Sequence, residues 1–409
     1  MKRKILTLIA AAATVAAMAQ VKPGIEVLRQ NGFESLQGKR VGLITNPTGV
    51  DNQLKSTIDI LHEAPGVELV ALYSPEHGVR GDVHAGDHVD NYTDPTTGVP
   101  VYSIYGKTRK PTPEMLKDVD VLIYDIQDNG CRSFTFISTM GVAMEACAEL
   151  DKEFMVLDRP NPVGGNKIEG NLAEEDCISF VSQFPIPYLY GLTPGELANY
   201  LNDEGLIGDS LKVKLTVIPM EGYTRDMDFR ETGMPWVLPS PHIPTPESAV
   251  YYPVSGILGE LGYMNIGVGY TEPFKLFCAE WIDAEALAKR LNDRKLPGLL
   301  FRPIHIKPFY SVGQGTNIQG VEVYVTDKAA APLSLTQFYV MEELADMYPD
   351  KKTFDNANEK RFSMFDKVCG SKQIRERFSK NHKVADIEDY WNKDVESFRQ
   401  SSQKYHLYK

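Results

Sequence analysis

Apolar residues in the first half of this chain occur as short continuous runs, and each run ends abruptly in a polar segment. The clearest run covers residues 70–73, and Glu76 and His77 follow it closely. A continuous apolar run without polar alternation is typical of a strand that is covered on both faces, as in parallel sheets. Runs of the same kind lie at residues 41–44, 119–124 and 155–157. The pattern therefore predicts four buried strands.

Helical patterns separate these runs. Residues 51–62 and 134–150 have apolar positions at helical spacing, and the sequence of residues 193–196, TPGE, has the form of a capping box with proline at the first helical position. A further strand is expected at residues 213–219. This alternation predicts a doubly wound, mostly parallel α/β sheet. Neither a GxGxxG turn after a strand nor a GxxxxGK[ST] loop occurs, so no nucleotide cofactor is expected.

The second half of the chain has a different organisation. Residues 236–253 are rich in proline, which predicts an irregular crossing between domains that forms part of the cleft wall. Beyond it, helices are expected at 283–292, 334–347 and 387–400 and strands at 299–308 and 321–326. We therefore expect two domains, a doubly wound α/β domain at residues 20–230 that carries the polar loops after its strands, and an α+β domain at residues 231–409.

The first 19 residues have the pattern of a secretory signal peptide. Lys2, Arg3 and Lys4 precede an apolar stretch, which ends in the small-residue site Ala17-Met18-Ala19. No later run approaches the roughly 20 apolar residues that a membrane span needs. We therefore expect a periplasmic or secreted protein without a membrane anchor.

Charge and cysteine content exclude several classes of partner and site. The net charge of −12 disfavours binding to nucleic acid. The five cysteines include no CxxC pair, so neither a zinc ribbon nor a disulfide scaffold is expected.

The polar segments that follow the four apolar runs form the candidate active site. Ligands of open parallel sheets bind outside the carboxyl ends of the strands, so these segments should converge at one edge of the sheet. The residues expected there are Asn46, Glu76, His77, Arg80, Asp125, Gln127, Asp128, Arg132, Asp158, Arg159 and Asn161.

Two kinds of hydrolysis fit these residue types. Glu76 and either Asp125 or Asp128 come from different strand ends and could flank a glycosidic bond, one carboxyl group as an acid and the other ionised. Alternatively, His77, His84 and His88 could hold a zinc ion, although their spacing in a glycine-rich loop is not a rigid one. An aspartate such as Asp125 can equally brace a loop, and both interpretations of it stay open.

Five segments stand out as motifs: SPEHGVRG (74–81), YDIQDNGCRSFTF (124–136), LDRPNPVGG with IEGN (157–171), YGLTPGELA (190–198) and PSPHIPTPESAVYYP (239–253). Together they resemble motifs of the exo-β-N-acetylmuramidase family, formerly the DUF1343 domain family. The resemblance implies a Rossmann-like domain and a smaller second domain with the active cleft between them. It also implies release of N-acetylmuramic acid from the non-reducing end of peptidoglycan fragments, and it makes Glu76 the leading catalytic carboxylate. We expect this reaction to need neither a cofactor nor a metal. Asp125 as the second catalytic group is our own interpretation.

The sequence departs from the family pattern at two places. Residues 128–132 read DNGCR where the pattern has DVG-x-R, and residues 267–274 read GVGYTEPF where it has GRGT-x-PF. An arginine expected from the second domain is therefore absent. The departures leave the catalytic loops intact and change the residues that could bind the substrate.

The substrate of such an enzyme carries a negative charge, because muramic acid has a lactyl carboxylate. Arg80, Arg132 and Arg159 lie on the converging loops, and arginine suits bidentate recognition of a carboxylate. Each of them could instead pair with a neighbouring aspartate as a loop brace. We expect an exported two-domain glycoside hydrolase; a metal-dependent hydrolase of another class and a non-catalytic protein that binds cell-wall fragments are the alternatives.

Overall fold

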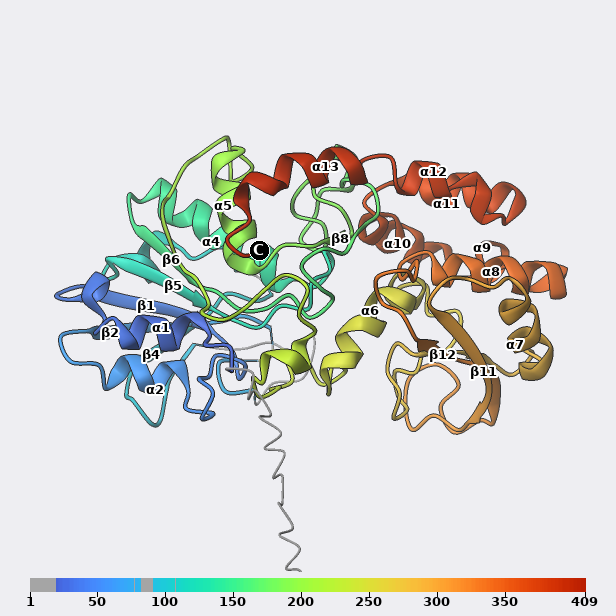
Figure 1. The fold of residues 1–409 in the computed structure, drawn as a ribbon, viewed down its shortest axis with the longest axis horizontal. Coiled ribbons are helices and arrows are strands. Elements are labelled where there is room, and N and C mark those ends of the chain that lie inside the picture. The colour runs from blue at the N-terminus through green and yellow to red at the C-terminus, as the bar shows by residue number, and fades with distance from the viewer. Residues whose placement is uncertain (1–19, 77, 82–90, 107) are drawn as a thin grey trace, which may run out of the picture.

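The computed structural model describes residues 20–76, 78–81, 91–106 and 108–409, and within them the chain forms two domains side by side (Figure 1). The first domain is built on a large sheet and the second on a smaller one. Helix α6 (Pro246–Gly259) lies between them, and residues 236–245 connect the first domain to it.

The sheet of the first domain has seven strands within the described residues, in the order β3-β4-β2-β1-β5-β6-β9. All neighbours pair in parallel except β3 and β4, so the prediction of a mostly parallel, Rossmann-like sheet is confirmed. The strand order reverses between β1 and β5, which is where such sheets usually bind ligands. The strands are β1 (Arg40–Thr45), β2 (Glu68–Ser74), β3 (Tyr92–Thr93), β4 (Pro100–Ser103), β5 (Val121–Asp125), β6 (Glu153–Leu157) and β9 (Lys214–Ile218).

Helices cover both faces of this sheet because alternate side chains of its strands point to opposite faces. Helices α4 (Phe136–Glu149) and α5 (Pro194–Asp203) pack on the face that presents Tyr73 and Tyr124. Helices α1 (Gly24–Gln30) and α2 (Thr57–His62) pack on the opposite face. The predicted capping box at the start of α5 is present, with Thr193 and Glu196 bonding each other's backbone N–H groups. The first domain also contains the short helix α3 (Pro113–Leu116) and the hairpin of β7 (Ile168–Glu169) and β8 (Leu189–Tyr190).

The second domain combines a three-stranded antiparallel sheet with helices, as the sequence predicted for this part of the chain. Its sheet order is β10-β12-β11. The elements are β10 (Leu276–Ala279), α7 (Ala284–Asp293), β11 (Leu299–Ile306), β12 (Ile318–Val325), α8 (Thr336–Met347), α9 (Thr353–Asn356), α10 (Phe362–Cys369), α11 (Lys372–Asn381) and α12 (Glu388–Trp391).

Three element predictions need correction. The helix expected at 51–62 begins only at Thr57, because Asp51 bonds the backbone N–H groups of a turn and Ser56 caps the helix. The proline-rich segment is not irregular throughout, since α6 covers its second half: Pro246 occupies the first helical turn, where no intrahelical N–H bond is lost, and α6 also contains Pro253. The helix expected at 387–400 is broken into α12 and α13 (Val395–Ser402).

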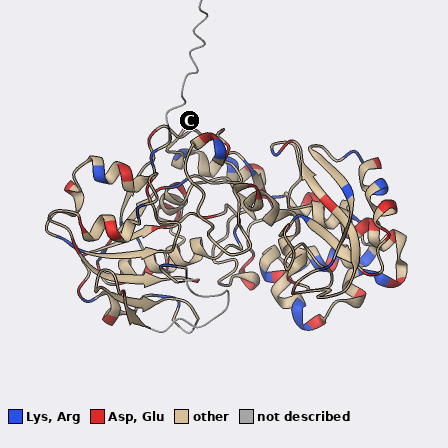
Figure 2. Cartoon of the chain, turned by 90° about the horizontal axis from the view of Figure 1, so that it is seen from below, with Lys and Arg blue, Asp and Glu red and all other residues tan. Residues whose placement is uncertain are grey.

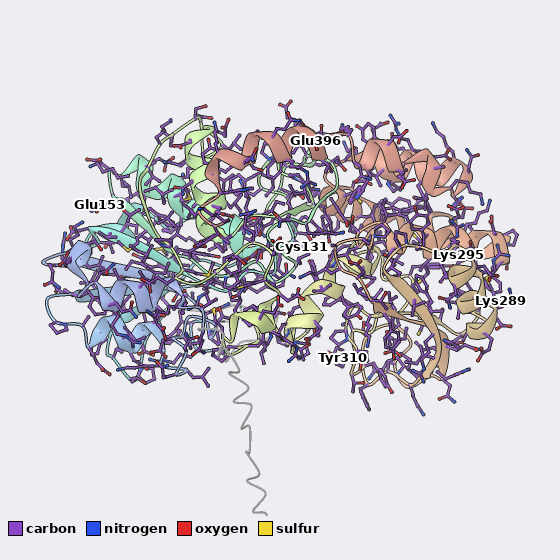
Figure 3. All side chains as sticks on the ribbon, in the orientation of Figure 1. Cys131, Glu153, Lys289, Lys295, Tyr310 and Glu396 are labelled. Carbon is purple, nitrogen blue, oxygen red and sulfur yellow. The ribbon has the colours of Figure 1, made fainter. Side chains whose placement is uncertain are left out.

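The end of the chain returns to the first domain (Figure 1). Phe398 of α13 and Tyr405 beyond it join the apolar cluster that contains residues of α4 and α5. Tyr408 packs in a small cluster with Val21 and Tyr223. The two domains also share a buried cluster around Cys131, which lies between them in Figure 3. Within the described part of the chain, every helix is too short or too polar to cross a membrane.

Candidate active site

A cavity of about 610 Å³ lies between the two domains. Side chains from both domains and from the connecting segment line it, which agrees with the prediction that the proline-rich segment forms part of the cleft wall. From the first domain these are Glu76, Tyr105, Arg109, Ser133, Phe134, Thr135, Phe136, Ser179, Phe180 and Val181; from the rest of the chain they are Ser240, His242, Ile243, Tyr252, Glu260, Phe274, Met364 and Lys367.

Glu76 is the carboxylate that the first domain contributes. It follows β2 in the segment after Ser74, it is half-buried, and it faces the cavity. Tyr105, just beyond β4, donates a hydrogen bond from its hydroxyl to Glu76 Oε1 at 2.8 Å. Burial and this bond raise the pKa of Tyr105, so the phenol keeps its proton and stays a donor. A donated hydrogen bond stabilises the negative charge of a carboxylate.

The segment that leads into α4 lines the same cavity as Glu76. Ser133 Oγ lies 3.2 Å from the hydroxyl of Tyr252 on α6, and the rings of Phe134 and Tyr252 meet edge to face with centroids 5.6 Å apart. These contacts join the two domains at the cavity. They fix the position of α6, and with it the second-domain wall, relative to Glu76.

The cavity contains two cationic side chains that form no ion pair with a described residue. Arg109 stacks its guanidinium over the ring of Phe180 at 4.4 Å, and Lys367 projects from α10. Acidic and basic residues are interspersed over both domains in the view of Figure 2. Positive charge for an anionic ligand is therefore local, and Arg109 and Lys367 supply it.

Asp125 lies elsewhere, and this placement argues against the catalytic role that we expected. Its carboxylate is fully buried and receives hydrogen bonds from Arg159 Nε at 2.5 Å, Arg159 Nη2 at 3.0 Å and Thr57 Oγ1 at 2.5 Å. Arg159 also donates to the backbone oxygen of Val50 at 2.8 Å. Both groups thus brace the loops at the ends of β1, β5 and β6, and neither lines the cavity.

The other two candidate arginines are also occupied. Arg80 forms a bidentate pair with the buried Asp94, at 2.7 and 2.9 Å, and reaches Asp59 at 3.3 Å. Arg132 is completely buried, and burial lowers its pKa to about 10. Its guanidinium donates to Ser182 Oγ and to backbone oxygens of both domains, those of Asn171, Ile186, Val368 and Cys369. Arg132 therefore ties the domains together rather than facing the cavity.

The remaining buried candidates hold loops in place. Asn46 accepts hydrogen bonds from the backbone and hydroxyl of Thr48, and Gln127 donates to the backbone oxygens of Asp128 and Pro160. Asn161 bridges Leu192 and Val163. Of the described residues that we expected in the site, only Glu76 lines the cavity.

Burial raises the pKa of two aspartates above the usual range of this residue. Burial raises the pKa of Asp128 to about 6, and Asp128 accepts hydrogen bonds from the Tyr190 hydroxyl and the backbone of Gly130. Burial likewise raises the pKa of Asp158 to about 7. Asp158 accepts from Tyr408 and Thr193 and from two backbone N–H groups, so it anchors the end of the chain to the first domain.

The histidine alternative falls on a part of the chain that the structure does not describe. His77, His84 and His88 all lie outside the described residues. Within the described residues, no group of three or more histidine, cysteine or acidic side chains is arranged to hold a metal ion.

Sequence reasoning missed several side chains of the cavity. Arg109 and Lys367 belong to none of the motifs. Glu260 lies at the end of α6, a helix that we did not expect because its sequence is rich in proline. Tyr252 belongs to the motif at 239–253, but its sequence position gave no sign that it would meet Ser133. Val268 stands where the family pattern has an arginine, and it packs beside Ile243 and Phe274, which line the cavity. The absent arginine would therefore have been close to this cavity.

Comparisons with known proteins agree on one family. The family model for the N-terminal part of the exo-beta-N-acetylmuramidase NamZ matches residues 41–247, and the model for its C-terminal part matches residues 250–408. A relative from Bacillus subtilis, the peptidoglycan beta-N-acetylmuramidase NamZ, is 46% identical over 389 residues, which cover 95% of this chain and 92% of the relative.

Two solved structures have similar folds, and both are DUF1343 family proteins from Bacteroides fragilis. The first has a TM-score of 0.92 and 65% identity, covering 95% of this chain and 99% of that one. The second has a TM-score of 0.73 and 28% identity, covering 96% of this chain and 99% of that one.

Proposed function

Because the chain belongs to the NamZ family of exo-β-N-acetylmuramidases, we propose that its interdomain cavity removes N-acetylmuramic acid from the non-reducing end of peptidoglycan fragments. The chain is a glycoside hydrolase, and this part of the sequence-based prediction is confirmed. The observation that carries the proposal is Glu76, a carboxylate that faces a cavity lined by both domains and holds a hydrogen bond from Tyr105.

Glu76 is the ionised carboxylate of the reaction. In glycoside hydrolysis one carboxylate must act as base, nucleophile or stabiliser of the positive charge that develops on the sugar ring. Glu76 lines the cavity and accepts a hydrogen bond from the neutral hydroxyl of Tyr105. It forms no ion pair with a described residue, so its negative charge is available to the substrate. Asp125, in contrast, forms a buried ion pair with Arg159, and we assign it the role of holding the loops at the strand ends.

Exo action at the non-reducing end has a clear signature in the products. A tetrasaccharide that begins with N-acetylmuramic acid should lose that one sugar and then stop, because the next sugar is N-acetylglucosamine. A tetrasaccharide that begins with N-acetylglucosamine should remain intact and is the matched control. Mass spectrometry of a time course distinguishes the two. Release of disaccharides, or cleavage of the control, would contradict the exo assignment.

Arg109 and Lys367 are the groups that we assign to the lactyl carboxylate of muramic acid. They line the cavity without a carboxylate partner among the described residues, whereas Arg80, Arg132 and Arg159 are held in other contacts. Arg109 also has a planar guanidinium suited to a carboxylate. This assignment replaces the three arginines that the sequence suggested.

Replacing Arg109 by leucine should reduce discrimination between a muramoside and the matching N-acetylglucosaminide. A hydrogen bond to a charged group contributes about 1.5–3 kcal/mol, so we expect the ratio of kcat/KM values to fall by about 10 to 100-fold, mainly through the muramoside. Arg80→Leu is the control, because Arg80 pairs with Asp94 outside the cavity. It should change both rates together and keep the ratio. An unchanged ratio in both variants would remove Arg109 from lactyl recognition.

We also propose that the protein is exported, to the periplasm or the outside of the cell. The support is the basic, apolar and small-residue pattern of residues 1–19, which precedes the described part of the chain. A peptidoglycan-degrading activity needs access to the cell wall, and export would provide it.

A further inference from the structure

The cavity contains a second carboxyl group that the sequence did not suggest. Glu260 follows the last turn of α6, on the opposite side of the interdomain cavity from the first domain, and it lines the cavity together with Glu76. The carboxyl groups of both residues act electrostatically on the hydroxyl of Tyr252, which places the two acids around the same tyrosine. The two domains thus each contribute one carboxyl group to one cavity.

The environment of Glu260 differs from that of Glu76. Burial raises the pKa of Glu260, and the charge of Arg361 opposes this only in part. Arg361 donates to the backbone oxygen of Glu260 at 2.9 Å rather than to its carboxylate. The other ionisable groups that line the cavity are Lys367 on α10, Tyr252 on α6, His242 in the connecting segment, and Tyr105, Arg109 and Glu76 from the first domain.

Local structure does not account for a glutamate at this position. Glu260 stands at the C-terminal end of α6, where the helix dipole disfavours negative charge and favours a cation. Its carboxyl group is not engaged by a hydrogen-bond donor or a salt bridge from the described residues. A half-buried acid in this setting is stabilised in its neutral form, and neutral acids at active sites serve as proton donors.

We propose that Glu260 is the general acid of this site, and that it protonates the glycosidic oxygen while Glu76 acts as the ionised carboxylate. The proposal rests on the muramidase function proposed above. Two carboxyl groups in different protonation states, on opposite sides of the scissile bond, are the arrangement that glycoside hydrolysis requires.

The reaction hydrolyses one glycosidic bond with one water molecule. The bond from the anomeric carbon to the glycosidic oxygen breaks, its electron pair leaves with the oxygen, and the proton of Glu260 converts that oxygen into the hydroxyl of the departing sugar. The oxygen of one water molecule forms the new bond to the anomeric carbon, and one proton of this water passes to Glu76. Solvent returns a proton from Glu76 to Glu260, so the sum is one substrate and one water giving two sugars.

The test compares two substrates in the Glu260→Gln variant. A muramic-acid-terminated disaccharide has a poor leaving group that needs protonation, whereas a dinitrophenyl muramoside has a leaving group that departs without it. General acid catalysis typically contributes about 10²–10⁴-fold, so kcat/KM should fall by that factor on the disaccharide and by less than about tenfold on the dinitrophenyl substrate. Wild-type activity should decline at high pH, where Glu260 loses its proton. This decline should be absent when Glu260→Gln acts on the dinitrophenyl substrate.

Controls separate this role from a structural one. Glu280→Gln, a change at an exposed glutamate outside the cavity, should leave both rates unchanged. Glu260→Asp keeps an acid and should retain more activity on the disaccharide than Glu260→Gln does. Equal losses on both substrates, or no loss on either, would overturn the proposal for Glu260. Failure of the wild-type protein to hydrolyse either muramoside would instead overturn the proposed function.

Discussion

Replacing Glu76 by glutamine is expected to lower kcat by about 10²–10⁴-fold on muramosides, with little change in KM. The amide keeps the shape of the side chain and can still accept the hydrogen bond from Tyr105, but it has no negative charge to give to the transition state. The loss should be similar for substrates with good and poor leaving groups, because the charge of Glu76 is needed in both cases. Steady-state kinetics on the dinitrophenyl muramoside and the disaccharide measure this directly.

Tyr105→Phe is the matched companion of this variant. It removes the hydroxyl that donates to Glu76 and keeps the ring. We expect a smaller loss in kcat than for Glu76→Gln, since the carboxylate itself remains. A loss below tenfold in Glu76→Gln, with an unchanged melting temperature, would remove Glu76 from the centre of the mechanism.

Replacing Asp125 by asparagine is expected to destabilise the fold by about 3–5 kcal/mol, because the buried Arg159 loses its counter-charge. The pair lies under the loops at the ends of β1, β5 and β6, and removing one charge leaves the other uncompensated in a dry environment. Urea unfolding of the wild type and the variant measures the difference. The kcat of the folded variant should stay within about tenfold of the wild type, unlike that of a variant in a general acid or base.

The double variant Asp125→Asn with Arg159→Met isolates the ion pair. Removing both charges should cost less stability than removing Asp125 alone, since no buried charge is left unpaired. A stable Asp125→Asn protein that has lost turnover would show that Asp125 takes part in the chemistry, and the bracing role would then be wrong.

The sequence predicted the frame of the first domain because its strands are buried on both faces. Continuous apolar runs marked β1, β2, β5 and β6, and the TPGE pattern marked the start of α5. Such signals are local, so they are readable without knowledge of the fold. The proline-rich α6 was missed because one proline occupies a tolerated position in its first turn and another lies inside the helix.

The site was predicted only in part because its geometry depends on contacts that are distant in sequence. Asp125 lies at the end of a strand, as expected for a catalytic residue. Arg159, which follows the neighbouring strand β6, forms an ion pair with it. The cavity lies beside the ends of β2 and β4 rather than over Asp125, because the second domain docks there through Tyr252. Glu260 and Lys367 enter the site only through this docking, and Arg109 comes from a segment of the first domain that carries no motif.

A crystal structure of the Glu76→Gln variant with a bound muramic-acid-terminated disaccharide tests the central claim most directly. We expect the muramic acid residue to occupy the interdomain cavity, with its anomeric carbon near residue 76. The glycosidic oxygen should lie near Glu260, and the lactyl carboxylate near Arg109 or Lys367. A sugar bound instead over the loops that carry Asp125 and Asp128, with the interdomain cavity free of substrate, would contradict it.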